Sequence, residues 1–172
     1  MKIIAGGSKI TSESVEAQGT GFSDYQLNIR ALDSGDKAHQ SLPYTFETWE
    51  FQDLIIANET TEDNTLTGDP DDDRYITSIE LEFTDSVEFM TQLNQGIIIW
   101  CYKGTDLLFS RSYSAKEKHS VYDGTNYVLT IDILPKLSWR IPAGTDFKIT
   151  YGNYTGNSID QVDGTIQYMQ PT

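Results

Sequence analysis

The amino-acid sequence predicts an all-β protein: an antiparallel β-sandwich, most simply a jelly roll, with an extended polar N-terminal arm. Three observations predict this fold class. Apolar and polar residues alternate along several segments, turn residues recur about every 8–12 residues, and helical periodicity is scarce. The 172 residues suffice for one domain with a sizeable core. Short strands at this spacing are typical of sandwiches and jelly rolls.

Four segments show the alternation most clearly, with β-branched and aromatic residues on one face of each. The positions predicted to face the core are Tyr25, Leu27, Ile29 and Ala31; Tyr75, Thr77, Ile79, Leu81 and Phe83; Tyr127, Leu129, Ile131 and Ile133; and Phe147, Ile149 and Tyr151. Each set recurs with a period of two, which indicates strands with one buried face.

Turn residues predict where these strands reverse. The segment Lys103–Asp106 is expected to close a hairpin, and Asp123–Gly124 suits a two-residue primed turn. Ile141–Gly144 places proline second and glycine fourth, as in a type I turn. The pair Asp163–Gly164 is expected to precede the last strand.

The domain organisation follows from polarity. Residues 1–21 are polar and lack a strand pattern, which predicts an N-terminal arm. Residues 22–172 are predicted to form a single β-sandwich domain. Residues 38–73 carry ten Asp or Glu and no Lys or Arg, and an acidic loop is expected at about 58–74.

Composition narrows the classes of partner. A net charge of −14 repels phosphate backbones and anionic lipid, so we expect no nucleic-acid partner and no membrane partner. Mean hydropathy is −0.42, no long apolar run is present, and no secretory signal is recognised. The single cysteine, Cys101, excludes an internal disulfide and is expected to be a small buried hydrophobe.

The acidic loop is the one candidate metal site. Against the spacing of an EF-hand loop, residues 63–74 have the wrong residue type at three ligand positions. A different calcium site built from Asp69, Asp71 and Asp73 is a candidate, since alternate residues of an extended loop can converge on one ion. The competing interpretation is a solvated loop whose like charges keep it extended.

No catalytic residues and no resident cofactor are predicted. Glu47 and Glu50 lie among aromatic residues, but side chains three apart on a strand face opposite sides unless a bulge near Glu47 brings them together. His39 and His119 have neither metal-ligand spacing nor a partnered nucleophile. No glycine-rich phosphate loop precedes a helix.

The segment 151–158, YGNYTGNS, has the composition of an adaptable binding loop. Tyr151, Asn153 and Tyr154 are the candidate contacts to a sugar or a protein partner. The alternative is an ordinary turn with asparagine and glycine in left-handed conformations.

Taken whole, this small acidic all-β chain resembles the β-sandwich auxiliary proteins of tailed bacteriophages, such as capsid decoration or cement proteins. The resemblance extends over the whole chain but rests on no motif. It implies a virion location after synthesis in the host cytoplasm, capsid or other virion proteins as partners, and a homo-oligomer. Its mechanism would be adhesion across subunits, with no enzymatic activity.

A second class of function stays open: a carbohydrate-binding module or receptor-binding head. It would use the Tyr/Asn loop to bind a glycan, with or without Ca²⁺ at the acidic loop.

Overall fold

The computed structural model describes residues 2–5, 8–11, 44–93 and 96–171. The chain divides into two compact units, Met1–Tyr44 and Thr45–Pro171. In the first, β1 (Lys2–Ala5) pairs antiparallel with β2 (Ser8–Thr11). The predicted polar arm therefore contains a two-stranded hairpin. The strand predicted around Tyr25 to Ala31 lies outside the described residues.

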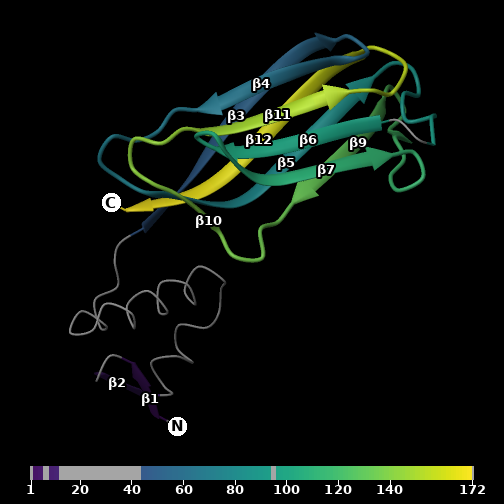
Figure 1. The fold of residues 1–172 in the computed structure, drawn as a ribbon. Coiled ribbons are helices and arrows are strands. Elements are labelled where there is room, and N and C mark those ends of the chain that lie inside the picture. Colours follow the sequence, from purple (N-terminus) through teal and green to yellow (C-terminus); the bar gives the residue numbers. More distant parts are fainter. Residues whose placement is uncertain (1, 6–7, 12–43, 94–95, 172) are drawn as a thin grey trace. The chain divides into compact units, whose positions relative to one another are not determined.

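The second unit is a β-sandwich, in which two sheets stack face to face (Figure 1). One sheet has the order β3-β12-β5-β9-β8, with β10 also paired to β5, and the other has the order β4-β11-β6-β7. The strands of the first sheet are β3 (Tyr44–Ile56), β5 (Arg74–Asp85), β8 (Val121–Tyr122), β9 (Tyr127–Ile133), β10 (Trp139–Ile141) and β12 (Ile159–Pro171). Those of the second are β4 (Thr60–Leu66), β6 (Gly96–Lys103), β7 (Asp106–Ser114) and β11 (Phe147–Asn153).

The strand order is that of a jelly roll. With the two short strands β8 and β10 left out, the remaining strands from β3 to β12 can be numbered one to eight. The first sheet then runs 1-8-3-6 and the second 2-7-4-5. Successive strands alternate between the two sheets, except that the fourth and fifth, β6 and β7, form a hairpin within one sheet, as in a jelly roll built of two Greek keys. The predicted all-β sandwich is confirmed.

The core lies between the sheets and is built from alternate residues of each strand. The predicted inward faces are confirmed on two strands, where the buried residues are Leu129, Ile131 and Ile133 of β9 and Phe147, Ile149 and Tyr151 of β11. Tyr127, the first predicted position of β9, is only half-buried. Each fully buried aliphatic or Phe side chain contributes about 1.5–3 kcal/mol relative to an exposed one.

A bulge in β5 changes which residues face the core. Ser78 pairs with Gln167 but Ile76 pairs with Tyr168, so Thr77 is an extra residue in β5. The alternation shifts by one at this point, and Ile76 is buried in place of its two neighbours. The predicted inward positions of Tyr75 and Thr77 are therefore wrong, whereas those from Ile79 onward are confirmed.

The predicted turn at Asp163–Gly164 is wrong, because β12 continues through both residues. Gly164 faces inward opposite Leu81, and the ring of Phe51 occupies the space a side chain at this position would need. Glycine therefore serves close packing within the strand rather than a change of direction.

The other predicted turns are found, two of them with different geometry. Lys103 pairs with Asp106 to close the β6–β7 hairpin, as predicted. The β8–β9 hairpin has a four-residue loop, because Tyr122 pairs with Tyr127. The proline turn begins one residue later than predicted, with Thr145 donating to the Pro142 carbonyl (3.0 Å).

Candidate functional site

The acidic segment is part strand and part loop. Its first half forms β4, an edge strand of the four-stranded sheet, so only residues 58–59 and 67–73 of the loop predicted at 58–74 lie outside strands. The side chains of Glu62 and Asp63 are exposed on β4. Charged side chains on an edge strand oppose pairing with a second sheet edge, which is a physical role for part of this charge.

Two of the three predicted calcium ligands already have partners within the chain. Asp69 accepts hydrogen bonds from the backbone N–H groups of Asp71 (3.0 Å) and Asp72 (3.2 Å), and these bonds lower the pKa of its carboxyl. Its Oδ2 lies 3.7 Å from a guanidinium nitrogen of Arg74. These contacts tie the Asp69 carboxylate to the backbone of the same loop, residues 67–73, and to the side chain of Arg74 beside it.

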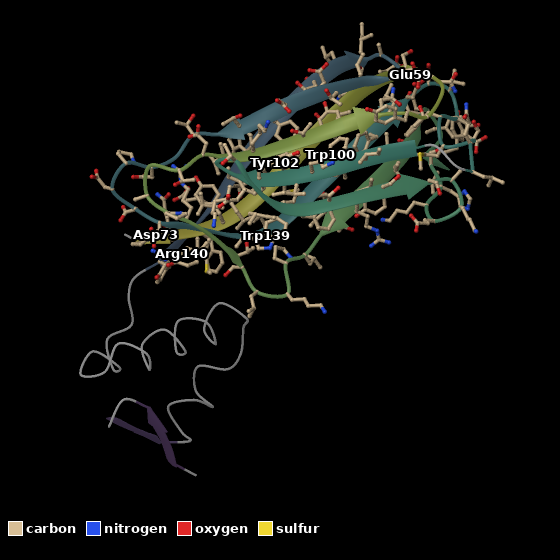
Figure 2. All side chains as sticks on the ribbon, viewed as in Figure 1. Glu59, Asp73, Trp100, Tyr102, Trp139 and Arg140 are labelled. Atoms are coloured by element: carbon tan, nitrogen blue, oxygen red, sulfur yellow. The ribbon has the colours of Figure 1, made fainter. Side chains whose placement is uncertain are left out.

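Asp73 is bound to the neighbouring turn. Its Oδ2 accepts from Nε of Arg140 (2.7 Å) and its Oδ1 accepts from the backbone N–H of Ala143 (3.1 Å). Figure 2 shows Asp73 and Arg140 together at one end of the sandwich. Among the described residues no three Asp, Glu, His or Cys side chains group as a metal ion would require. Calcium at Asp69, Asp71 and Asp73 stays a prediction.

The predicted binding loop is largely core. Tyr151 and Asn153 are both fully buried on β11, so neither side chain is available to contact a partner, and these two predicted contacts are wrong. The Tyr151 hydroxyl donates to Asp53 Oδ2 (2.7 Å), and its ring meets Phe83 edge to face with centroids 5.6 Å apart. Burial, and then this hydrogen bond, raise the pKa of Tyr151. Tyr154 remains half-exposed.

A row of aromatic side chains lies instead on the outer face of the four-stranded sheet. Because Ile97, Ile99 and Cys101 of β6 are buried, Trp100 and Tyr102 face outward and are half-exposed. Figure 2 shows both on β6. Tyr154 joins them, and we call Trp100, Tyr102 and Tyr154 the aromatic row.

Gly152 positions two of these rings. A side-chain carbon at this residue would lie 2.6 Å from Cε2 of Tyr154 and 3.3 Å from Cζ3 of Trp100. Both rings therefore extend over the bare backbone of β11, and Gly152 is buried beneath them although it faces outward. Both rings remain half-exposed, so part of each is open to solvent.

A cluster of polar side chains adjoins the aromatic row. Asp63 on β4 accepts hydrogen bonds from the Thr150 hydroxyl and from Lys148 Nζ (3.2 Å). The Thr150 bond, followed by Lys148, lowers the pKa of Asp63. The ammonium of Lys148 also lies 4.9 Å from the ring centre of Tyr102. We call Asp63, Lys148 and Thr150 the polar cluster.

Of the residues on this face, only Tyr154 was among the contacts predicted from the sequence. The signal was available: if Ile97, Ile99 and Cys101 face inward, Trp100 and Tyr102 face outward by the same period of two. Cys101 itself is buried as predicted, and burial raises the pKa of its thiol to about 12.

The described residues include no helix long and apolar enough to cross a membrane. No family model and no curated protein sequence matches the chain. Solved structures with similar folds include viral capsid proteins and a carbohydrate-binding module.

Three of the solved structures with similar folds show how different the proteins that carry this fold are. Latent dimeric PorU from Porphyromonas gingivalis is 9% identical with a TM-score of 0.42, over 72% of this chain and 13% of its own. VP2 of infectious bursal disease virus, as a subviral particle, is 11% identical with a TM-score of 0.40, over 74% and 32%. The Caldicellulosiruptor saccharolyticus module CBM27-1, in complex with mannohexaose, is 12% identical with a TM-score of 0.35, over 71% and 66%. At these values they assign no function to this chain.

Proposed function

We propose that this chain is a non-enzymatic structural protein of a virus particle, a capsid decoration or cement protein that stabilises the shell through protein–protein contacts. The jelly-roll strand order is compatible with this role, since capsid subunits are among the proteins that use it. Because one fold hosts many functions, the proposal needs support from a specific surface as well.

That surface is an apolar tip at the end of β3. Leu54 and Ile55 are 64% and 76% exposed, which is unusual for two adjacent large aliphatic residues. Ile55 also has a φ of 57°, a left-handed conformation that strongly disfavours a β-branched residue. A strained, exposed apolar residue suits a contact that is buried on assembly, and strain of this kind concentrates at functional sites.

The backbone next to the tip is held rigidly. Glu59, which also has a positive φ of 62°, donates its N–H to the carbonyl of Asn153 (2.6 Å). The amide oxygen of Asn58 accepts from the N–H of Gly156 (2.9 Å). Figure 2 places Glu59 at the end of the sandwich opposite Asp73 and Arg140. The tip is therefore presented by an ordered loop pair, which limits the entropy lost on binding.

Light scattering combined with the variant Ile55→Asn tests the proposal. Asparagine tolerates a positive φ and removes the apolar side chain, so it should stabilise the fold while weakening assembly. We expect the wild-type chain to form a symmetric trimer or larger ring. The variant should dissociate into monomers at higher protein concentrations than the wild type does. A wild-type monomer at all concentrations, or an oligomer unchanged by Ile55→Asn, would count against this role for the tip.

The alternative, a carbohydrate-binding module or receptor-binding head that uses the Tyr/Asn loop, loses its predicted site because Tyr151 and Asn153 are buried. Of its three predicted contacts only Tyr154 is half-exposed, so a saccharide would have to bind mainly through other side chains.

A further inference from the structure

We propose that the outer face of the four-stranded sheet binds a neutral saccharide, with the aromatic row as the stacking surface and the polar cluster as the hydrogen-bonding groups. The inference is independent of the particle role, since it concerns a different surface from the apolar tip. A cement protein and a binding module could each carry such a site.

The strand register brings the two groups of residues onto one face. Thr150 of β11 pairs with Trp100 on one side and with Asp63 on the other. Two residues along β11, on the same face, Lys148 pairs with Tyr102. Adjacent strands lie about 4.8 Å apart, so a pyranose ring stacked on Trp100 extends its edge over Thr150 and toward Asp63.

The side chains suit the two chemistries of a sugar. The C–H faces of a pyranose pack on aromatic rings, and its hydroxyls need charged or polar partners at the ring edge. Trp100 and Tyr154 extend over the bare backbone of Gly152 and are both half-exposed, so a sugar can reach them from solvent. The carboxylate of Asp63 accepts and the ammonium of Lys148 donates, and their mutual hydrogen bond holds both side chains in place.

Other occupants fit less well. Nucleic-acid bases also stack on aromatic rings, but a chain of net charge −14 repels a phosphate backbone. A stable protein interface buries about 800 Å² on each partner, far more than three half-exposed rings supply. Within the polar cluster the charges of Asp63 and Lys148 cancel, which favours a neutral saccharide over a sialylated or uronic one.

A glycan array followed by calorimetric titration tests the inference. The array carries neutral and anionic glycans, and mannohexaose and cellohexaose serve as soluble neutral probes. We expect retention of neutral glycans, with at least tenfold weaker binding for Trp100→Ala and for Tyr102→Ala. Tyr122→Ala is the matched control, since Tyr122 is exposed on the other sheet and should leave the affinity unchanged.

Asp63→Asn provides a second variant at an exposed position, in case loss of an aromatic ring destabilises the sheet. It keeps the shape of the side chain but removes its charge, and should weaken binding severalfold while the variant stays fully folded at the temperature of the titration. Absence of retention on the array, selective retention of anionic glycans, or equal binding by wild type and Trp100→Ala would each overturn the inference. A monomeric wild-type protein would not contradict the saccharide site, because the proposed assembly depends on the apolar tip and not on this face.

Discussion

Replacing Asn153 with alanine tests whether this side chain holds loops together at one end of the sandwich. Its Nδ2 donates to the carbonyls of Ile56 (3.0 Å) and Asn157 (2.8 Å). Its Oδ1 accepts from the backbone N–H (3.1 Å) and the hydroxyl (2.8 Å) of Thr155. One fully buried amide thus joins the β3–β4 turn to the β11–β12 turn.

The size of the effect follows from what alanine leaves behind. The Ile56 carbonyl and the Thr155 N–H lose this partner, whereas the Asn157 carbonyl keeps a hydrogen bond from the Thr155 hydroxyl (3.1 Å). A buried group left unsatisfied costs about 1–3 kcal/mol. Two such groups give about 2–6 kcal/mol, and we expect a loss of about 3–4 kcal/mol in the free energy of unfolding. For a domain of this size that lowers the midpoint by roughly 10 °C.

Urea unfolding followed by tryptophan fluorescence measures this loss. Asn157→Ala is the matched control, because Asn157 is exposed and takes part in these hydrogen bonds through its backbone. The control should lie within about 0.5 kcal/mol of wild type. A loss below about 1 kcal/mol for Asn153→Ala, with an unchanged m-value, would refute a structural role for these hydrogen bonds.

Three further outcomes follow from the same contacts. The thiol of Cys101 has a pKa of about 12 and is buried, so it should not react with a disulfide reagent at pH 8 until the chain unfolds; labelling of the folded protein would contradict this. EDTA should leave the thermal midpoint unchanged, because Asp69 and Asp73 already have partners within the chain, and a fall of several degrees would instead establish a metal site. The hydrogen bond from Thr150 lowers the pKa of Asp63, so the stability it contributes is full above the unfolded pKa of about 3.9 and is lost as pH falls through the lower folded pKa. Asp63→Asn should therefore flatten the acid limb of the stability–pH curve, and an unaltered limb would show that the bond contributes nothing.

The fold class was predictable because a strand with one buried face has apolar residues at every second position, and this pattern is visible within a short segment of sequence. The inward sets of β9 and β11 required only that each strand present one face to the other sheet. The hairpin at Lys103–Asp106 was also predictable from a short segment, because two residues that include a glycine, between two strands, favour a tight hairpin turn.

The predictions that failed depended on contacts between distant segments. The bulge at Thr77 exists only in relation to the register of β12, which no local pattern encodes. Gly164 reads as a turn residue until the ring of Phe51 is known to cover it. Asn153 reads as a loop residue, yet it is buried because it supplies hydrogen bonds to a turn almost a hundred residues away. Polar residues with long-range structural roles have the same composition as binding loops, so composition alone could not separate the two.

The outer face of the six-stranded sheet leads to a last prediction. The register places Glu82 directly opposite Asp163, and Glu80 directly opposite Asp132. Like charges at opposed positions destabilise a sheet by a few tenths of a kcal/mol to about 1 kcal/mol per pair. Glu82→Gln should therefore raise the free energy of unfolding by a few tenths of a kcal/mol at low salt, measured against Glu88→Gln in an exposed loop.

The gain should vanish in 1 M NaCl, where the screening length falls to about 3 Å. A gain that persists at high salt would show that repulsion is not its cause. If the gain is electrostatic, two copies of this acidic face would repel each other in the same way that its strands do. Self-association of the chain would then proceed through a surface without this charge, and the apolar tip at Leu54 and Ile55 is such a surface.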